Sequence, residues 1–126
     1  MVWNFKDTYI DLPNIFYSKV KPDTFKNKKL ILFNRDLANE INLNFDKFND
    51  IEICDILLGS NQLNKVFFSQ AYAGHQFGHF SILGDGRALL LGEHITNNNQ
   101  RFDIQLKGSG LTPYSRNGDG KAALGP

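Results

Sequence analysis

Three glycine-rich segments that carry basic side chains are the parts of the sequence best suited to bind an anion. They are "LGDGR" at residues 83–87, "KGSG" at 107–110 and "RNGDGK" at 116–121. Glycine has no Cβ, so main-chain N–H groups in such turns can approach a ligand closely. The basic residues spaced among them are Arg87, Lys107, Arg116 and Lys121. The pattern predicts loops that meet a phosphate group.

The first segment places Gly84 and Gly86 on either side of Asp85, where a predicted hairpin opens. This spacing lets main-chain N–H groups converge on an anion, and the planar fork of Arg87 suits two phosphate oxygens. The alternative interpretation is a tight turn that carries a solvated arginine.

Lys107 ends a predicted strand, "RFDIQLK", whose side chains alternate in polarity. Phe102, Ile104 and Leu106 share one face, and Asp103, Gln105 and Lys107 share the other. Lys107 is therefore expected to project away from the core. A strand-ending lysine beside a glycine-rich hairpin follows the plan of protein kinases, in which a strand lysine pairs with nucleotide phosphates. The alternative is an ordinary surface lysine at a strand end.

Two formal nucleotide-binding motifs are not met. No G-x-x-x-x-G-K-[ST] segment occurs, which argues against a P-loop. The letters of "GDGKAA" at residues 118–123 match G-x-G-x-x-A, but a proline-containing loop precedes them instead of a strand. A dinucleotide-binding fold is therefore not supported.

Other chemistry has weaker support in the sequence. His75 and His79 are four residues apart, as two zinc ligands on a helix would be, but Gln76 stands where a glutamate would follow, and no third ligand is obvious. A small histidine-based metal-binding protein is thus one alternative, although packing or hydrogen bonding is favoured for His75. Cys54 lies in a predicted helix stripe, where a buried, inert thiol is expected.

An N-terminal segment, residues 1–64, is expected to form an arm and small helices that precede the glycine-rich region. Prolines and scattered aromatic residues in residues 1–27 indicate an extended arm laid over a neighbouring surface, with no regular structure assigned. The run "KKLILFN" at residues 28–34 predicts a short buried strand.

Two short helices are expected after this strand. Asn34 can cap the first helix, Asn49 and Glu52 are spaced as a capping box for the second, and Gly59 is placed to end it. The apolar stripes are Leu37 and Ile41 in the first helix, and Ile53, Ile56 and Leu57 in the second.

Residues 65–126 read as a glycine-rich, lysine-bearing hairpin region. The expected elements are a strand "KVFFSQAYA", a turn "GHQFGHF", a run "SILGDGRALLLGEHI", a polar loop "TNNNQ" and the strand "RFDIQLK". The last two runs, separated by the polar loop, predict an antiparallel hairpin.

Composition places the chain among globular proteins. It has 126 residues, 41% of them hydrophobic, with a formal charge of +1, so no nucleic-acid or membrane partner is indicated. The N-terminus lacks the continuous apolar run of a secretory signal, and one cysteine excludes an internal disulfide. A cytoplasmic location is expected.

The blocks "YAGHQFGHF", "LGDGRALLLGE" and "DIQLKGSGLTPYSRNGDGKAALGP" together resemble the SelO family, also called YdiU, of kinase-like protein adenylyltransferases. The match in letters, order and spacing is dense over residues 70–126 and less diagnostic before them. The resemblance implies an α+β chain with an antiparallel sheet and a few short helices, forming the N-terminal part of a kinase-like fold. It also implies that the nucleotide lies reversed, so that AMP passes from ATP to a Ser, Thr or Tyr hydroxyl of a protein.

The resemblance further implies which residues contact ATP. Carried over by motif, these positions are Gly84, Gly86, Arg87, Lys107, Asp119 and Gly120. Lys107 corresponds to the kinase strand lysine. A carboxylate repels phosphate, so Asp119 is expected to contact ribose or base donors instead.

The family's catalytic base and the ligands of its Mg²⁺ or Mn²⁺ are expected beyond residue 126, so no catalytic or metal-binding residue is assigned here. We therefore interpret the chain as the N-terminal portion of an adenylyltransferase that is catalytically incomplete by itself. The alternative from another class is a non-catalytic interaction module that persists without the rest of the enzyme.

The purified 126-residue chain is expected not to transfer AMP, because group transfer rests on the metal, the base and the cations acting together. Incubation with ATP labelled on the α-phosphate and a mixture of proteins measures this directly. Label that becomes covalently attached to protein would overturn the expectation.

Overall fold

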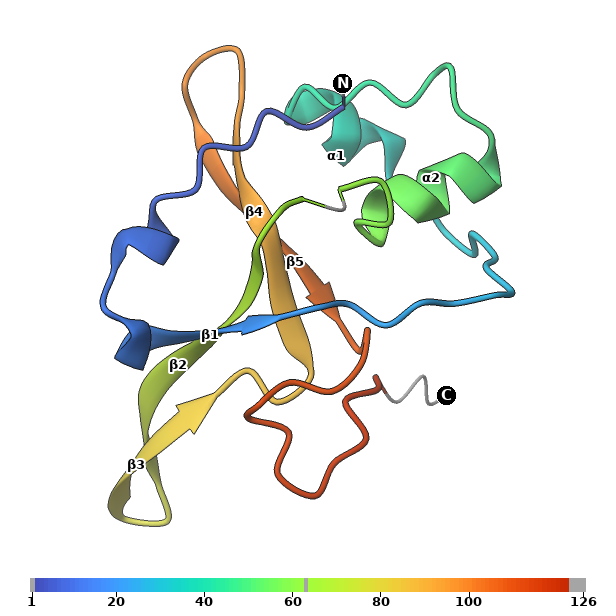
Figure 1. Ribbon diagram of the computed structural model, residues 1–126. Helices are drawn as coiled ribbons and strands as arrows, with labels where there is room; N and C mark the ends of the chain where they lie inside the picture. Colours follow the sequence, from blue (N-terminus) through green and yellow to red (C-terminus); the bar gives the residue numbers. More distant parts are fainter. Residues whose placement is uncertain (1, 63, 123–126) are drawn as a thin grey trace.

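The computed structural model describes residues 2–62 and 64–122 as an α+β structure built on one antiparallel sheet of five strands (Figure 1). The strands run in the spatial order β1-β2-β4-β5, and β3 pairs with β2 off this path. Their bounds are Tyr17–Val20, Phe67–Gln76, His79–Gly84, Ala88–Ile95 and Arg101–Lys107. Two short helices, α1 (Arg35–Glu40) and α2 (Asp50–Leu57), complete the α+β class expected from the sequence.

The central feature of the sheet is the hairpin of β4 and β5, which confirms the predicted pairing across the polar loop at residues 96–100. The register joins Ile95 to Arg101 at the loop end and Ala88 to Lys107 at the open end. A bulge between Leu90 and Gly92 shifts the register once. The open end of the hairpin is therefore the end that carries the predicted phosphate loops.

Side chains of β5 alternate between half-buried and exposed along its whole length, as the sequence predicted. Phe102, Ile104 and Leu106 pack against the core, whereas Lys107 is exposed on the opposite face. A shift of one residue in this pairing would bury the lysine and expose the apolar set, so burial of one face specifies the register.

Both helices form where the capping residues predicted them. The Asn34 side chain accepts a hydrogen bond from the Leu37 N–H, and Asn49 and Glu52 form a reciprocal capping box. Gly59, with φ of +71°, follows the end of α2. Cys54 lies on α2 as a buried free thiol, as expected.

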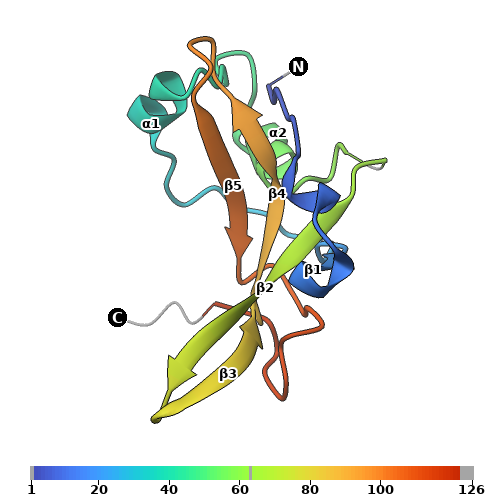
Figure 2. The same ribbon diagram turned by 90° about the vertical axis from the view of Figure 1, so that its left-hand side faces the viewer.

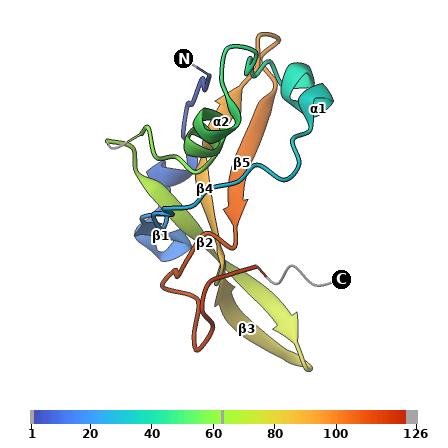
Figure 3. The same ribbon diagram turned by 90° about the vertical axis from the view of Figure 1, so that its right-hand side faces the viewer.

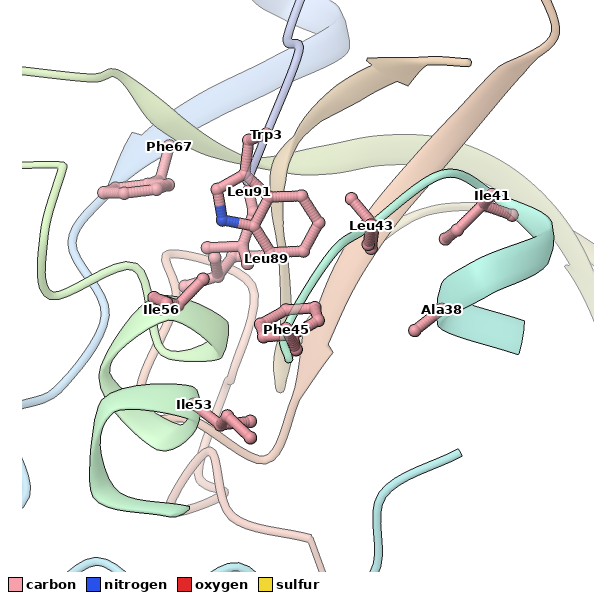
Figure 4. Close-up of a cluster of buried hydrophobic side chains, with 10 residues drawn as sticks. All are labelled: Trp3, Ala38, Ile41, Leu43, Phe45, Ile53, Ile56, Phe67, Leu89 and Leu91. Atoms are coloured by element: carbon pink, nitrogen blue, oxygen red, sulfur yellow. The ribbon is translucent and has the colours of Figure 1, made fainter. Parts of the chain in front are cut away.

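The helices and the N-terminal arm enclose the core against one face of the β4–β5 hairpin (Figure 4). Ten buried residues form it: Trp3, Ala38, Ile41, Leu43, Phe45, Ile53, Ile56, Phe67, Leu89 and Leu91. The helices gather near one end of the sheet, and the β2–β3 hairpin extends from the other end (Figures 2 and 3). The core thus lies under the helix-bearing part of the sheet and reaches as far as Leu89, the second residue after the glycine turn.

The N-terminal arm lies along the sheet, as the sequence indicated, but part of it is regular. Phe5 bridges to His94, and Asn4 donates its side-chain amide to the carbonyl of Ile95. Further along, β1 pairs with β2, which the sequence did not predict. Short strands of this kind form because a partner edge is available, and that edge is visible only in the folded sheet.

The β2–β3 hairpin differs from its predicted outline. The expected turn "GHQFGHF" is mostly strand, and only Phe77 and Gly78 form the turn, with φ of 51° and 78°. Two consecutive positive φ angles match the twist of a two-residue hairpin. The predicted run at residues 81–95 also divides, because the glycine turn at 84–87 separates β3 from β4.

The predicted strand "KKLILFN" at residues 28–34 is wrong. No strand forms there, and Ile31 and Leu32 are 79% and 88% exposed. Leu30 and Phe33 pack against the core, so the segment acts as a connection with two anchoring side chains. A run of apolar residues becomes a strand only where another strand pairs with it, and none of the described strands pairs with residues 28–34.

Glu93 on β4 holds the arm to the sheet. Its side chain, only 7% exposed, accepts hydrogen bonds from the N–H groups of Thr8 and Tyr9 and from the Thr8 hydroxyl. Arg101 pairs with the same carboxylate at 2.9 Å. Burial is the largest single influence and by itself raises the pKa of Glu93, but the hydrogen bonds and the Arg101 charge together bring that pKa below its ordinary value.

Replacing Glu93 with Gln is expected to lower the free energy of unfolding by about 1.5–3 kcal/mol at pH 7, because charged hydrogen bonds are lost. The pKa of Glu93 is lowered by folding, so its stabilisation is present above the ordinary value of 4.5 and is lost as pH falls through the folded-state pKa. The difference between wild type and variant should therefore shrink below that pH.

Urea unfolding followed from pH 7 to pH 3 measures this difference. Glu40→Gln, on the exposed surface of α1, is the matched control and should change stability little. A difference for Glu93→Gln that stays constant over this range would contradict the role of its ionised carboxylate.

Candidate phosphate-binding site

The glycine turn at residues 84–87 lies directly beside the end of β5. β3 ends at Gly84 and β4 begins at Ala88, which is the register partner of Lys107. The Gly108 N–H donates to the Arg87 carbonyl at 2.6 Å, so the main chain after the lysine is bonded to the turn. Lys107 and the turn, far apart in sequence, are therefore neighbours at one end of the sheet.

The loop after β5 returns to its own start. Ser109 forms an isolated bridge with Lys121, and the Gly110 N–H donates to the Gly120 carbonyl at 3.2 Å. Gly120 has φ of +71°, and a Cβ there would lie 2.1 Å from the Gly110 carbonyl oxygen. This position requires glycine for both reasons, and the closure brings residues 119–121 beside residues 109–110.

Asp119 has a local structural contact. Its Oδ1 accepts a hydrogen bond from the Lys121 N–H at 2.9 Å, and the side chain is exposed. Aspartate commonly closes a turn in this way. This contact explains why a carboxylate stands at position 119, which phosphate binding does not explain because the two negative charges repel.

A short turn at residues 112–115, "TPYS", attaches the second loop to the first, and sequence reasoning had not singled it out. The Thr112 hydroxyl donates to the Asp85 carbonyl and the Ser115 hydroxyl donates to the Gly86 carbonyl, both at 2.5 Å. The Tyr114 hydroxyl and the Ser18 hydroxyl on β1 lie 2.9 Å apart. The only signal in the sequence is a cluster of hydroxyl residues around a proline.

Gly84 is needed where Tyr114 packs. A Cβ added to Gly84 would lie 2.3–2.6 Å from three carbons of the Tyr114 ring, closer than any real contact. Gly86 meets the main chain of Tyr114 and Ser115 in the same way, at 2.8–3.4 Å. The glycines of "GDGR" therefore allow the close approach of the 112–115 turn, whatever ligand the site takes.

Asp85 lies in the turn with its carboxylate partly buried. Burial raises the pKa of Asp85, while a hydrogen bond from the Gln70 N–H and the nearby Lys107 charge each partly offset the rise. The local charge is thus mixed, with Arg87 and Lys107 beside one carboxylate.

Several main-chain amides of the glycine loops are already in use. The N–H groups of Asp85, Gly108 and Gly110 donate to the carbonyls of Gln70, Arg87 and Gly120. Two cavities of about 470 Å³ lie elsewhere: one is lined by Trp3, Phe48 and Ile56, the other by Phe25, Lys29 and Leu57. At the turn itself, Arg87 and Lys107 are exposed and Asp85 is half-buried.

The histidines do not form a pair. β2 and β3 join His75 to Phe80 and Gln76 to His79, so the two histidines point to opposite faces of the hairpin. Within residues 2–62 and 64–122, no three His, Cys, Asp or Glu side chains lie together as metal ligands. His94, the third histidine, is buried and bonded to the Asn4 N–H and the Ile41 carbonyl, which is a packing role.

Across the described ranges, the helices are too short and too polar for any of them to cross a lipid bilayer.

The fold and the site together define an α+β protein that gathers two glycine-rich loops, a strand-end lysine and an arginine at one end of an antiparallel sheet. Comparison with known proteins identifies the class more closely. The family model described as "Protein adenylyltransferase SelO" matches residues 1–125. The chain therefore belongs to the SelO family.

Relatives in three bacteria, all named "Protein nucleotidyltransferase YdiU", are similar to this chain. The chain is 55% identical to "Protein nucleotidyltransferase YdiU" of Clostridium perfringens over 125 residues, 98% of this chain and 26% of the relative. The corresponding proteins of Brevibacillus brevis and Pelagibacter ubique are 53% and 50% identical over the same shares. The chain thus spans about a quarter of the length of the curated relatives it matches.

Replacing Gly84 with Ala is expected to cost about 1–3 kcal/mol of unfolding free energy, because the new methyl group collides with the Tyr114 ring. The same substitution in a Tyr114→Ala background should cost clearly less, since the ring is gone. Thermal and urea unfolding of the four proteins of this cycle measure the coupling.

Tyr72→Ala provides the matched control for this cycle, because Tyr72 is an exposed tyrosine on the same hairpin. Gly84→Ala should cost as much in that background as in wild type. Equal costs in all three backgrounds would show that Tyr114 does not account for the glycine.

Proposed function

We propose that this chain forms the nucleotide-binding part of a protein adenylyltransferase, which transfers AMP from ATP to Ser, Thr or Tyr hydroxyls of proteins. The observation that carries the proposal is the position of Lys107 beside the glycine turn at 84–87. Membership of the SelO family supports the reaction class, because its relatives are protein nucleotidyltransferases.

In this proposal six residues contact ATP: Gly84, Gly86, Arg87, Lys107, Asp119 and Gly120. Lys107 supplies a mobile point charge and Arg87 a planar fork, and both neutralise phosphate oxygens. The glycines allow the main chain to approach the phosphates. Asp119, exposed at the start of the 119–121 turn, accepts hydrogen bonds from ribose or base donors through its second carboxylate oxygen, Oδ2.

The architecture we propose is the N-terminal part of a kinase-like lobe. Its support is an antiparallel sheet in which a strand-end lysine lies next to a glycine turn, as in protein kinases. The nucleotide would lie reversed relative to kinases, so that the α-phosphorus faces the acceptor. An acceptor hydroxyl oxygen then bonds to the α-phosphorus and gives up its proton to a base outside the described residues. The bond between the α-phosphorus and the oxygen that bridges to the β-phosphorus breaks, and pyrophosphate leaves.

A divalent metal, Mg²⁺ or Mn²⁺, belongs to the chemistry that the resemblance implies, but the described residues do not fit one. No three potential ligand side chains among residues 2–62 and 64–122 lie together. We therefore derive no step through a metal and assign this chain the roles of binding and charge neutralisation. The partners of this site are ATP and hydroxyl-bearing proteins, and we propose a cytoplasmic location in keeping with the single buried Cys54.

Lys107→Ala is expected to weaken ATP binding by the 126-residue chain on the order of tenfold, because one charged contact to phosphate is lost. Isothermal titration with ATP at fixed ionic strength measures the dissociation constant. Lys47→Ala, which removes an exposed lysine from the loop before α2, is the matched control and should bind as wild type does.

Two results would count against the proposal. Equal affinity of wild type and Lys107→Ala would remove the lysine from the site. An absence of ATP binding by a folded wild-type chain would favour the interaction module instead.

A further inference from the structure

The 112–115 turn holds the main chain of the glycine turn by two successive carbonyls. Thr112 donates its hydroxyl to the carbonyl of Asp85, and Ser115 donates to that of Gly86, each at 2.5 Å. The Thr112 hydroxyl also accepts from the Tyr114 N–H, and the Ser115 hydroxyl accepts from the Thr112 N–H. Each hydroxyl is therefore oriented by a donor behind it, so both hydrogen bonds to the glycine turn have a defined direction.

These two hydrogen bonds determine where two amides point. In a trans peptide group the C=O and the following N–H point in opposite directions, and none of the described peptide bonds is cis. The carbonyl of Asp85 shares its peptide group with the Gly86 N–H, and the carbonyl of Gly86 shares its group with the Arg87 N–H. Because both carbonyls face the 112–115 turn, both N–H groups face away from it.

The side to which these amides point has the properties of an anion site. Within residues 2–62 and 64–122, neither the Gly86 N–H nor the Arg87 N–H donates to another group of the chain. The next carbonyl, that of Arg87, bonds to the Gly108 N–H, so the turn lies beside Lys107. Successive main-chain N–H groups that donate to no other group are the donors from which main-chain anion sites are built, and Lys107 lies on the strand beside this turn.

We infer that Thr112 and Ser115 are positioning residues that aim the Gly86 and Arg87 N–H groups at a phosphate of the bound nucleotide. The inference rests on the proposed function and adds to it a specific pair of amide donors and the two hydroxyls that set their direction. Without those hydroxyls the peptide groups of the glycine turn can rotate, and the amides no longer converge on one anion.

The test uses the folded 126-residue chain and two probes, ATP and inorganic tripolyphosphate. In wild type the ¹H–¹⁵N signals of Gly86 and Arg87 should shift on addition of either probe, and adenosine should leave them in place. Ser115→Ala and Thr112→Val should raise the dissociation constant for both phosphate probes about tenfold and reduce these shifts. A variant that is merely destabilised would change signals throughout the protein, and not only the phosphate affinity and the Gly86 and Arg87 shifts.

Conservative variants and a control keep the result interpretable. Ser115→Thr and Thr112→Ser retain a hydroxyl and should bind both phosphate probes nearly as tightly as wild type. They keep the inference testable if Ser115→Ala or Thr112→Val folds poorly. Ser60→Ala, an exposed serine after α2, should bind as wild type does. Unfolding midpoints of all variants report whether each is folded at the temperature of the titration.

The outcomes separate this inference from the proposed function. If wild type binds ATP but the Gly86 and Arg87 signals stay in place, or the hydroxyl-free variants bind equally well, the inference is overturned and the proposed function stands. If tripolyphosphate shifts both amides while ATP does not bind, the amide site is supported and the nucleotide function fails. If neither probe shifts them, the inference is wrong.

Discussion

The pairing register of β4 and β5 is the constraint on which the candidate site depends. The apolar face of β5 must lie against the core, and this requirement excludes a register shifted by one residue, which would turn Lys107 inward. The observed register keeps Leu106 half-buried and Lys107 exposed. That register places Lys107 opposite Ala88, the first residue after the glycine turn. The position of the lysine beside the turn is therefore a consequence of the pairing that buries the apolar face of β5.

Hydrogen bonds within and between the glycine-rich loops fix how the main chain beside Lys107 is oriented. The loop after β5 closes on itself at Gly110 and Gly120, and its 112–115 turn bonds to the carbonyls of residues 85 and 86. Hydrogen bonds from hydroxyls are directional, and peptide planes are rigid, so tying down carbonyls on one side orients amides on the other. The glycines permit this approach because a Cβ would occupy the space of the Tyr114 ring.

Elements with strong local signals were predictable. Asn34 and the Asn49–Glu52 capping box located both helices, and the alternation of residues 101–107 located β5 and the exposed face of Lys107. Elements whose existence depends on a partner were not. β1 has no clear strand pattern in its sequence and forms because it can pair with the edge of β2. The apolar run at residues 28–34 is a connection, and only Leu30 and Phe33 pack against the core.

The sequence by itself determined which residue types are available to the site. It placed basic side chains among glycines, gave β5 one polar face and contained sequence blocks that are specific to a family. Only the tertiary structure decided how those groups are arranged, for instance that His75 and His79 face opposite ways and that Thr112 and Ser115 bond to the glycine turn. The physical reason is that periodicity and capping act between residues close in the chain, whereas hydrogen bonds between loops depend on a register and a packing that the whole sheet sets.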